Sequence, residues 1–544
     1  MNISTQSGNI GMVVEGSMSD GIQVKLDPHT SVEQIKVGTF VTVEGKNLRF
    51  FGVVTNISLN ATDPSLIISP PEISESYTRE VLTGIAAYGS ISVEPMLTLS
   101  GEDETVLLEG PQPSKTIPDH FSMTKLATEN DIQLVFGAED ERHFWIGSPL
   151  DMDTKLCLDI HQFVTRSNGV FGKSGTGKTF LTRLLLAGIL QTDAAVNLVF
   201  DMQSEYGWKG YSEGGAEVKG LKQLFHSKVA VFSLDEESSK RRGLTPDYVV
   251  RIGLDEVEPD DIQLLRETLD LSEVAADAAY SLERHFGSSR WLRDFLSLDS
   301  KQNIFELAEE IGVNGNALAR LKNRLDRLRR FQFIEDTGHG SVEQIMRYLD
   351  RGMHVILEFG RYGSNLAAYI LVANLLTRRI YDRCVERKER SVDGHETETK
   401  PIVITIEEAH KFLMPGIASQ TIFGTIAREL RKYNVTLLLV DQRPSGIDDE
   451  VMSQLGTKMS CLLDSERDVD AVLTGAPGSR KLRNVLSRLE SKQQALVFGD
   501  SVPMAIVVKT REYGSSESYR SLGFKDSLET KANLDSDVDD LFGP

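Results

Sequence analysis

The sequence predicts an α/β protein in which a small amino-terminal β-barrel precedes a mostly parallel sheet covered by helices. Residues 8 to about 145 show short alternating apolar runs split by Gly and Asn turns, which is typical of a small barrel. From Ile146 apolar strands alternate with helices, which favours a parallel sheet buried on both faces. A glycine-rich loop between a strand and a helix gives that sheet a phosphate-binding edge.

The bulk properties are those of an ordinary globular protein of more than one domain. The chain has 544 residues, of which 40% are hydrophobic and 26% are charged. Its formal net charge of -21 argues against a surface that binds nucleic acid everywhere, although a local basic channel remains compatible with it. Cys157, Cys384 and Cys461 form no CxxC pair, so we expect three reduced structural thiols.

No segment of the sequence predicts a membrane anchor. The longest apolar stretch, Leu366 to Leu376, is too short to cross a bilayer. The amino terminus has no basic flank followed by an apolar stretch, as a secretory signal would. We therefore expect a cytoplasmic protein without membrane contact.

The chain divides into four predicted parts. These are a β-barrel over 1–145, an α/β core over 146–209 and 350–515, a helical insertion over 210–349 and an acidic tail over 516–544. The predicted core strands are Gly169–Gly172, Asn197–Asp201, His354–Phe359, Ile402–Ile406, Thr436–Val440 and Met459–Leu463. The insertion contains a basic stretch, Lys322 to Arg330, which is either a solvated helix face or a DNA contact.

The strongest motif is a complete GxxxxGK[ST] loop placed after a short strand and before a helix. Its glycines allow backbone N–H groups to surround a β-phosphate, and the helix amino terminus favours negative charge. Lys178 is predicted to reach the β and γ oxygens and Thr179 to bind Mg²⁺, with ATP as the nucleotide. The predicted nucleotide-binding residues are Gly172, Lys173, Ser174, Gly175, Thr176, Gly177, Lys178, Thr179 and Phe180, together with Arg166.

Two adjacent carboxylates end the apolar strand that begins at Ile402. Open parallel sheets place ligand sites at the carboxyl ends of their strands. Neighbouring residues at a strand end point in different directions, so Glu407 is predicted to approach Mg²⁺ and Glu408 to polarise the attacking water. Asp201 also ends an apolar strand, with Glu205 four residues later. It is predicted either to support the magnesium shell or to be purely structural.

A polar amide, Gln442, ends the next buried strand and can hydrogen-bond both the γ-phosphate and the water. Its distance after the acidic strand, with one helix between, is what a RecA-like core with an additional strand between its two Walker strands requires. That intervening helix is predicted to carry Arg428 and Arg431 on one face. One of them is predicted either to act as an arginine finger, which contacts the γ-phosphate bound by a neighbouring subunit, or to form salt bridges within the helix. Arg166 is a further candidate for the arginine finger.

Taken together, these motifs resemble the HerA family of hexameric DNA-translocating ATPases. The resemblance rests on Trp145 to Leu150, the phosphate loop, Asp201 with Glu205–Tyr206, Glu407 to His410, and Gln442 to Pro444. It implies a HAS-type barrel, a homo-oligomeric ring of six subunits with ATP shared between neighbours, double-stranded DNA in the pore, and a nuclease partner of the NurA type. This chain has Arg166–Ser167 where the family usually has Arg–His, and Glu407 where Asp is usual.

The leading hypothesis is therefore an ATP-driven double-stranded DNA translocase or helicase that works with a nuclease or other effector in DNA end processing or anti-phage defence. A conjugative or segregation pump is disfavoured because those usually carry a membrane anchor. A scaffold or protein-remodelling ATPase that uses nucleotide as a switch remains the alternative, because the chain is acidic overall. No signature of a second active site is present in the sequence, so any nuclease activity is assigned to a partner.

Overall fold

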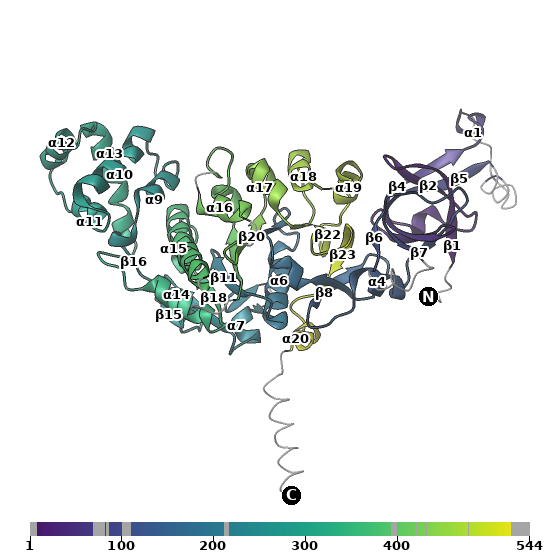
Figure 1. Ribbon diagram of the computed structural model, residues 1–544, viewed down its shortest axis with the longest axis horizontal. Helices are drawn as coiled ribbons and strands as arrows, with labels where there is room; N and C mark the ends of the chain where they lie inside the picture. The colour runs from purple at the N-terminus through teal and green to yellow at the C-terminus, as the bar shows by residue number, and fades with distance from the viewer. Residues whose placement is uncertain are drawn as a thin grey trace, which may run out of the picture.

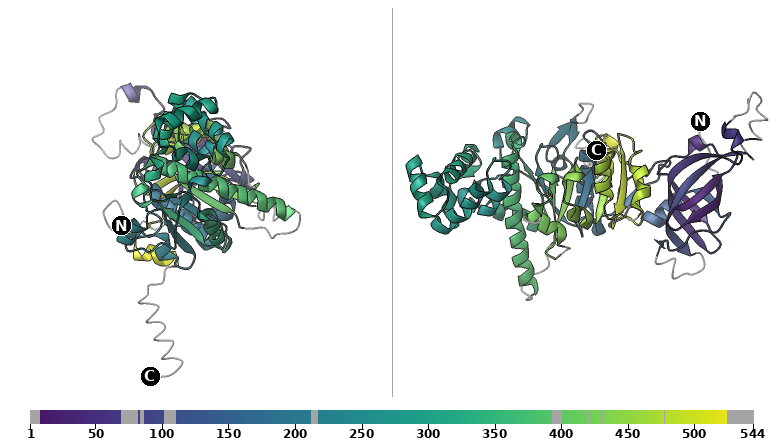
Figure 2. Two further views of the ribbon diagram at one scale, coloured as in Figure 1. Left: turned by 90° about the vertical axis from the view of Figure 1, so that its left-hand side faces the viewer. Right: turned by 90° about the horizontal axis from the view of Figure 1, so that it is seen from above.

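The computed structural model describes residues 8–68, 82, 86–100, 110–211, 217–392, 400–418, 421–429, 432–476 and 478–523. A β-barrel lies at one end of the elongated molecule, a helical subdomain at the other, and a large sheet with its covering helices between them (Figures 1 and 2). This arrangement confirms the predicted α/β class, with its small barrel ahead of a P-loop core. Of the predicted acidic tail over 516–544, residues 516–523 are described and contain the helix α20 (Ser516–Ser521), whereas residues 524–544 lie outside the described residues.

The barrel is antiparallel and closes because β2 pairs with both β1 and β5. Its strands are β1 (Asn9–Ser17), β2 (Gly21–Leu26), β3 (Phe40–Glu44), β4 (Leu48–Ala61), β5 (Ala87–Ser100) and β7 (Met123–Leu126), and β6 (Gln112–Pro113) extends β5. Alternate residues such as Ile22, Val24 and Val54 are fully buried inside it. Arg49 of β4 reaches Asp131 of α4 (Glu129–Phe136) at 2.7 Å, which fastens the barrel to the next segment.

The central sheet contains twelve strands in the order β15-β14-β18-β11-β19-β20-β10-β21-β22-β23-β8-β9. The strands from β15 to β21 are parallel, and those from β22 to β9 are antiparallel. Their bounds are β8 (His143–Pro149), β9 (Leu156–Asp159), β10 (Asn168–Phe171), β11 (Val196–Asp201), β14 (Val229–Ser233), β15 (Tyr248–Val249), β18 (His354–Glu358), β19 (Ile402–Glu407), β20 (Val435–Asp441), β21 (Thr457–Ser460), β22 (Gln494–Gly499) and β23 (Ile506–Thr510). Because β20 lies between β19 and β10, the predicted additional strand is confirmed.

Helices cover both faces of this sheet, and alternate strand residues point into two separate cores. In β11, Leu198 and Phe200 belong to one core and Val199 to the other. The core that contains Val199 is covered by α4, α5 (Ile160–Phe163), α6 (Lys178–Thr192), α7 (Leu221–Leu224) and α20 (Ser516–Ser521). The opposite core is covered by α14 (Ser341–Asp350), α15 (Leu366–Val392), α16 (Ile422–Arg428), α17 (Asp449–Gln454), α18 (Glu466–Leu473) and α19 (Ser479–Leu486). No helix in the described ranges is long and apolar enough to span a membrane.

The range 210–349, predicted as a helical insertion, is helical only in part. Its first portion supplies β14 and β15 to the central sheet, and β12 (Lys209–Tyr211) pairs with β13 (Glu217–Lys219) in a small hairpin. The helical subdomain begins later and comprises α9 (Pro259–Leu264), α10 (Glu273–Phe286), α11 (Trp291–Leu296), α12 (Lys301–Glu310) and α13 (Gly315–Leu325). The prediction is wrong for β14 because a short buried apolar run such as Val229 to Ser233 has no period that separates strand from helix.

Ion pairs neutralise much of the basic stretch from Lys322 to Arg330. Lys322 lies 2.7 Å from Asp326, and Arg324 lies 2.6 Å from Asp270. Arg329 lies 3.7 Å from Asp336. These pairs favour the solvated helix face over the DNA contact, because an arginine already held by a carboxylate has less to gain from a phosphate.

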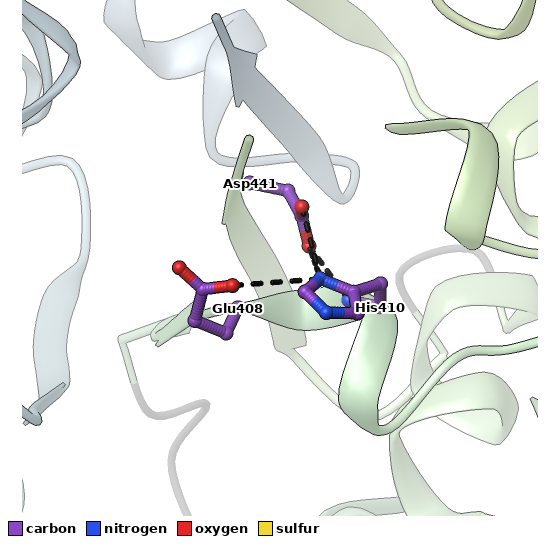
Figure 3. Close-up of side chains that lie close together, drawn as sticks. All are labelled: Glu408, His410 and Asp441. Atoms are coloured by element: carbon purple, nitrogen blue, oxygen red, sulfur yellow. Dashed lines mark hydrogen bonds and ion pairs between the residues drawn. The ribbon is translucent and has the colours of Figure 1, made fainter. Parts of the chain in front are cut away.

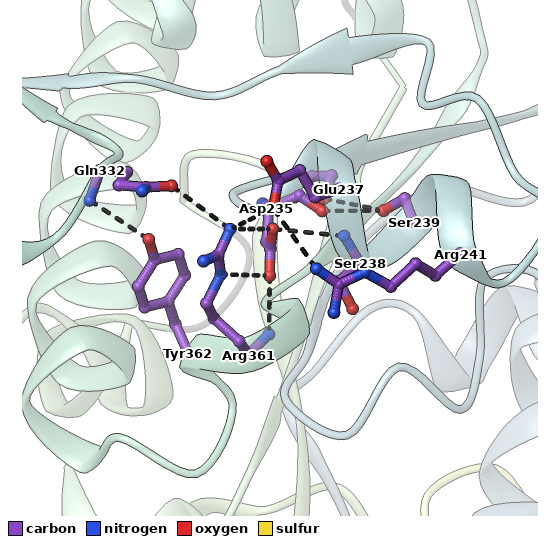
Figure 4. A network of polar contacts seen from close by, with 9 residues as sticks. Asp235, Glu237, Ser238, Ser239, Arg241, Gln332, Arg361 and Tyr362 are labelled. Carbon is purple, nitrogen blue, oxygen red and sulfur yellow. Dashed lines mark hydrogen bonds and ion pairs between the residues drawn. The ribbon is translucent and has the colours of Figure 1, made fainter.

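A polar network joins the ends of the neighbouring strands β14 and β18 to the segment that follows the helical subdomain (Figure 4). Arg361, in the short η4 helix (Gly360–Tyr362) after β18, donates to both carboxylate oxygens of Asp235 at 2.8 Å. The Arg361 guanidinium also donates to the Gln332 side chain at 3.3 Å, and the Gln332 backbone N–H donates to the Tyr362 hydroxyl. Because a paired guanidinium fixes distance and angle together, the Arg361–Asp235 contact holds the segments that follow β14 and β18 in a fixed arrangement.

Candidate nucleotide site

A cavity of about 310 Å³ opens where β10, β19 and β20 end. The phosphate loop, the two acids after β19 and the amide after β20 all line it. These residues include Ser174, Gly175, Gly177, Lys178, Thr179, Phe180, Glu407, Glu408 and Gln442. The parallel register aligns the strand ends, with Phe171 opposite Asp441 and Glu407 opposite Val440. Residues more than 200 positions apart in sequence therefore face one cavity.

The phosphate loop depends on glycine at two places. Gly172 has a φ of 153°, and a Cβ there would lie 2.7 Å from the Cβ of Cys461 on the neighbouring strand. Gly177 has a φ of 95°, in the left-handed region, where it caps the amino terminus of α6. The helix can therefore begin at Lys178, which points its first free N–H groups toward the cavity.

Lys178 and Lys173 are held by different partners. The Lys178 ammonium donates to the Lys173 carbonyl at 2.8 Å, which keeps the charge inside the loop. Burial lowers the pKa of Lys178, while nearby acids act in the opposite direction. The Lys173 side chain turns outward to Asp464 at 2.8 Å. Lys178 is therefore the loop residue whose charge faces a bound phosphate.

Glu407 is held from one side only. The Tyr206 hydroxyl donates to its Oε1 at 3.0 Å, whereas Oε2 is buried without a hydrogen-bond partner among the described residues. Burial, together with the charges of Asp201 and Glu205, raises the pKa of Glu407 to about 8. A buried carboxylate oxygen with no donor, next to a cavity that Thr179 also lines, fits a divalent cation with oxygen ligands.

Glu408 belongs to a tight polar cluster at the same strand ends (Figure 3). Its backbone has a φ of 51°, and its Oε1 accepts a hydrogen bond from the Gln442 amide at 3.2 Å. The His410 ring nitrogen Nδ1 lies 2.9 Å from Asp441 and 3.6 Å from the other Glu408 oxygen. The His410 backbone N–H also donates to Asp441 at 2.7 Å. The cluster fixes Glu408 at the cavity wall in a conformation that a non-glycine residue rarely adopts.

Asp201 supports the site without lining it. The side chain is fully buried, and its oxygens accept from the backbone N–H groups of Glu205, Tyr206 and Gly207 at 2.8, 2.8 and 3.1 Å. Burial, together with the charge of Glu358, raises its pKa to about 7. Its hydrogen bonds favour the structural alternative, since they shape the turn that carries Glu205 into the cavity wall.

The arginines predicted for the site lie elsewhere or outside the described residues. Helix α16 ends at Arg428, and Glu429 after it has an extended backbone. The Arg428 guanidinium lies 3.4 Å from Glu450 and donates to the Ala418 carbonyl, while Arg431 lies outside the described residues. Arg166 precedes β10, at the opposite end of the strand from the phosphate loop, and pairs with Asp500 at 3.0 Å. It therefore does not reach its own chain's cavity.

Several residues of this site were not assigned a role from the sequence. Asp441 and His410 position Glu408, and Tyr206 positions Glu407. A charged residue at the end of an apolar strand is a usable signal for Asp441, because strand ends of a parallel sheet meet at one edge. Tyr206 carries no comparable signal, since its contact depends on the turn that Asp201 organises.

Comparison with known proteins identifies the relatives of this chain. The family model described as "Helicase HerA, central domain" matches residues 144–380, which include the phosphate loop and Glu205–Tyr206. The DNA double-strand break repair helicase HerA of Sulfurisphaera tokodaii is 22% identical over 93% of this chain and 93% of its own length. The protein of the same name from Saccharolobus solfataricus is 22% identical over 87% of each. Over most of its length this chain is therefore similar to helicases named HerA, and residues 144–380 match the central domain of that family.

Solved structures similar to this chain are more distant in sequence. VirB4 of Thermoanaerobacter pseudethanolicus covers 70% of the chain and 99% of its own length, at 15% identity and a TM-score of 0.45. The conjugative coupling protein TrwB covers 72% of the chain and 93% of its own length, at 12% identity and a TM-score of 0.46.

We predict that the two adjacent acids separate by phenotype. Glu408→Gln should bind nucleotide but hydrolyse it about 10²–10⁴-fold more slowly, because it loses only the water-polarising group. Glu407→Gln should instead raise the Mg²⁺ concentration that half-maximal turnover requires. Titrating Mg²⁺ against ATP turnover distinguishes the two, with Glu236→Gln on the α8 helix (Glu236–Arg241) as the matched control outside the cavity. Exchanged phenotypes would reverse the assignment.

Proposed function

We propose that this protein is an ATP-driven double-stranded DNA translocase or helicase of the HerA type that acts in DNA repair. The observation that carries the proposal is the single cavity in which the phosphate loop, Glu407, Glu408 and Gln442 meet. The relatives that match most of the chain are named as helicases of DNA double-strand break repair. Anti-phage defence is a second setting in which the same motor would serve.

Nucleotide binding follows from the phosphate loop. The N–H groups at the start of α6 would surround the β-phosphate of ATP. Lys178 would exchange its bond to the Lys173 carbonyl for the β and γ oxygens, which costs little because the ammonium only swivels between acceptors. The aromatic ring of Phe180 lines the same cavity one residue after Thr179 and borders the bound nucleotide.

Mg²⁺ is the proposed cation, held by the Thr179 hydroxyl and by Glu407. When bound, it neutralises phosphate charge that builds up as the γ-phosphoryl group leaves. Glu407 would supply the buried oxygen that has no donor among the described residues, and the Tyr206 hydroxyl holds the other oxygen in place. Glu is longer than the Asp usual in the family by one methylene, and the Tyr206 hydrogen bond restricts that extra freedom.

Hydrolysis is assigned to Glu408 and Gln442. Glu408 would take a proton from the attacking water, since its carboxylate lies at the cavity wall with His410 and Asp441 behind it. The Gln442 amide donates to Glu408 at 3.2 Å. A γ-phosphate would draw that amide away from Glu408, so the presence of ATP is transmitted to β20 through one hydrogen bond.

The assembly proposed is a ring of six copies with nucleotide shared between neighbours. Within one chain the described part of the cavity contains Lys178 and Arg183 as its basic residues. A further positive charge would come from a neighbouring subunit, with Arg431 first and Arg428 or Arg166 as the other candidates. A nuclease of the NurA type is the proposed partner, which would cut the DNA that the ring supplies.

DNA binding is expected at the pore despite the acidic overall charge of -21. Only inward-facing charges matter to a duplex in the axis of a ring, and an acidic outer surface limits non-specific contact. The pore would bind the DNA through its backbone phosphates, so binding would not depend on the base sequence.

The DNA proposal predicts that duplex DNA stimulates ATP turnover. Stimulation should fall steeply with salt, since each neutralised phosphate contributes about -0.9 to the log–log slope. The measurement is turnover with and without double-stranded DNA at several salt concentrations, alongside particle mass, with Lys178→Ala as the inactive control. A confirmed hexamer that shows no DNA dependence, alone or with a nuclease partner, would instead indicate the nucleotide-switched scaffold.

The shared-site proposal predicts rescue in mixed rings. Combining Glu408→Gln with Arg431→Ala subunits should restore turnover, because some interfaces then hold an intact acid and an intact arginine. The matched control mixes Glu408→Gln with Lys178→Ala, which should stay inactive since both groups serve the same subunit's cavity. No recovery in verified mixed rings, or full activity of Arg431→Ala alone, would exclude Arg431 as the finger.

A further inference from the structure

Arg183 is a buried arginine on the second turn of α6, directly behind the phosphate loop. Its side chain is 1% exposed, and its guanidinium lies between two aromatic rings, 5.4 Å from the centroid of Phe180 and 5.4 Å from that of Tyr513. Its Nη2 donates to the Glu205 backbone carbonyl, while Nε and Nη1 have no hydrogen-bond partner among the described residues. No carboxylate is paired with it in the described part of the chain.

This arrangement is energetically unusual for a residue with a purely structural role. A buried charge without an ion pair loses its hydration, and each unsatisfied N–H adds to that cost. Cation–π attraction to the two ring faces offsets part of the free-energy cost of burying the guanidinium. An apolar side chain would fill the same space between Phe180 and Tyr513 without the penalty, so the positive charge and its single hydrogen bond need another explanation.

That explanation lies in what the hydrogen bond holds. Glu205 belongs to the turn after β11, and its side chain lines the nucleotide cavity together with Thr179 and Glu407. The Asp201 carboxylate accepts hydrogen bonds from backbone N–H groups of the turn, and the Arg183 guanidinium donates a hydrogen bond to a backbone carbonyl of the same turn. The next residue, Tyr206, donates its hydroxyl to Glu407. The turn is therefore fixed from two sides at the point where it meets the acid proposed to hold Mg²⁺.

The space around Arg183 is equally specific. A Cβ at Gly210 in the β12 strand would overlap the Nη2 atom, so the close approach of the guanidinium to the turn requires glycine there. The Tyr513 hydroxyl donates to the Lys219 carbonyl at 2.7 Å, which holds the second ring in place independently of Arg183. The contact can thus be broken from the Arg183 side or from the Gly210 side.

We propose that Arg183 is a positioning residue of the nucleotide site, which holds the Asp201–Gly207 turn so that Glu205 faces the Mg²⁺–nucleotide complex and Tyr206 stays on Glu407. The inference rests on the proposed ATPase function. It assigns to Glu205 a place at the outer side of the cation, where a carboxylate can accept hydrogen bonds from the cation's water ligands.

The test measures binding of a fluorescent ADP analogue by the full chain while Mg²⁺ is titrated. Arg183→Met keeps an unbranched side chain between the rings but cannot hold the carbonyl. It should raise the Mg²⁺ concentration for half-maximal binding by about tenfold, in the range found for residues that support a metal's ligands. Arg183→Lys should recover part of the shift, because an ammonium can still donate to Glu205. Gly210→Ala should reproduce it, and Tyr513→Phe, which keeps the ring, should match the parent.

Binding without Mg²⁺ separates this role from a general defect. It should change much less than the Mg²⁺ requirement does in Arg183→Met, because Arg183 is only 1% exposed where it lines the cavity and the phosphate loop keeps Lys178. Equal losses with and without Mg²⁺, or a parental Mg²⁺ requirement in folded Arg183→Met, would overturn the proposal. If Arg183→Met does not fold, Glu205→Ala is measured instead, because it keeps the backbone carbonyl and loses the carboxylate. A parental Mg²⁺ requirement in Glu205→Ala would also overturn the proposal. Undiminished binding by Lys178→Ala would instead refute the nucleotide site itself.

Discussion

The parallel pairing of β10, β20 and β19 is the constraint on which the site depends. Parallel strands end at the same edge of a sheet, and the register here sets Phe171 beside Asp441 and Glu407 beside Val440. The phosphate loop, the sensor amide and the two acids emerge from these ends within one cavity. A shift of one residue in either pairing would turn each side chain to the other face of the sheet, and the cavity would lose its acids.

Buried charge is the second feature that organises the site. Glu407 and Asp201 are both buried, and burial, together with the charge of Asp201, raises the pKa of Glu407. Such groups are costly without a partner of opposite charge, and among the described residues one Glu407 oxygen has no donor. In the proposed function a cation and a nucleotide would occupy this site, and their binding would offset part of the energy that burial of these acids costs.

The sequence was most informative where apolar strands end in a polar residue. The six core strands and the additional-strand order were predictable, because long buried runs and a complete phosphate loop leave few arrangements of a parallel sheet. The strands β14, β22 and β23 were not predicted. A short apolar run such as Val229 to Ser233 is compatible with either a strand or a buried helix turn. The helix predicted to continue past Arg428 stops there, because Glu429 takes an extended backbone that no local signal specified.

The contacts between side chains distant in sequence were beyond sequence reasoning. His410 on Asp441, Tyr206 on Glu407 and Arg183 on Glu205 each depend on a turn whose shape follows from tertiary packing. The central claim, that one cavity at these strand ends holds Mg²⁺ and ATP, is tested most directly by an experimental structure of Glu408→Gln with both bound. The account predicts the cation between the Thr179 hydroxyl and Glu407, with the Gln442 amide turned from Glu408 to the γ-phosphate. A cation bound away from Glu407, or a nucleotide outside this cavity, would contradict it.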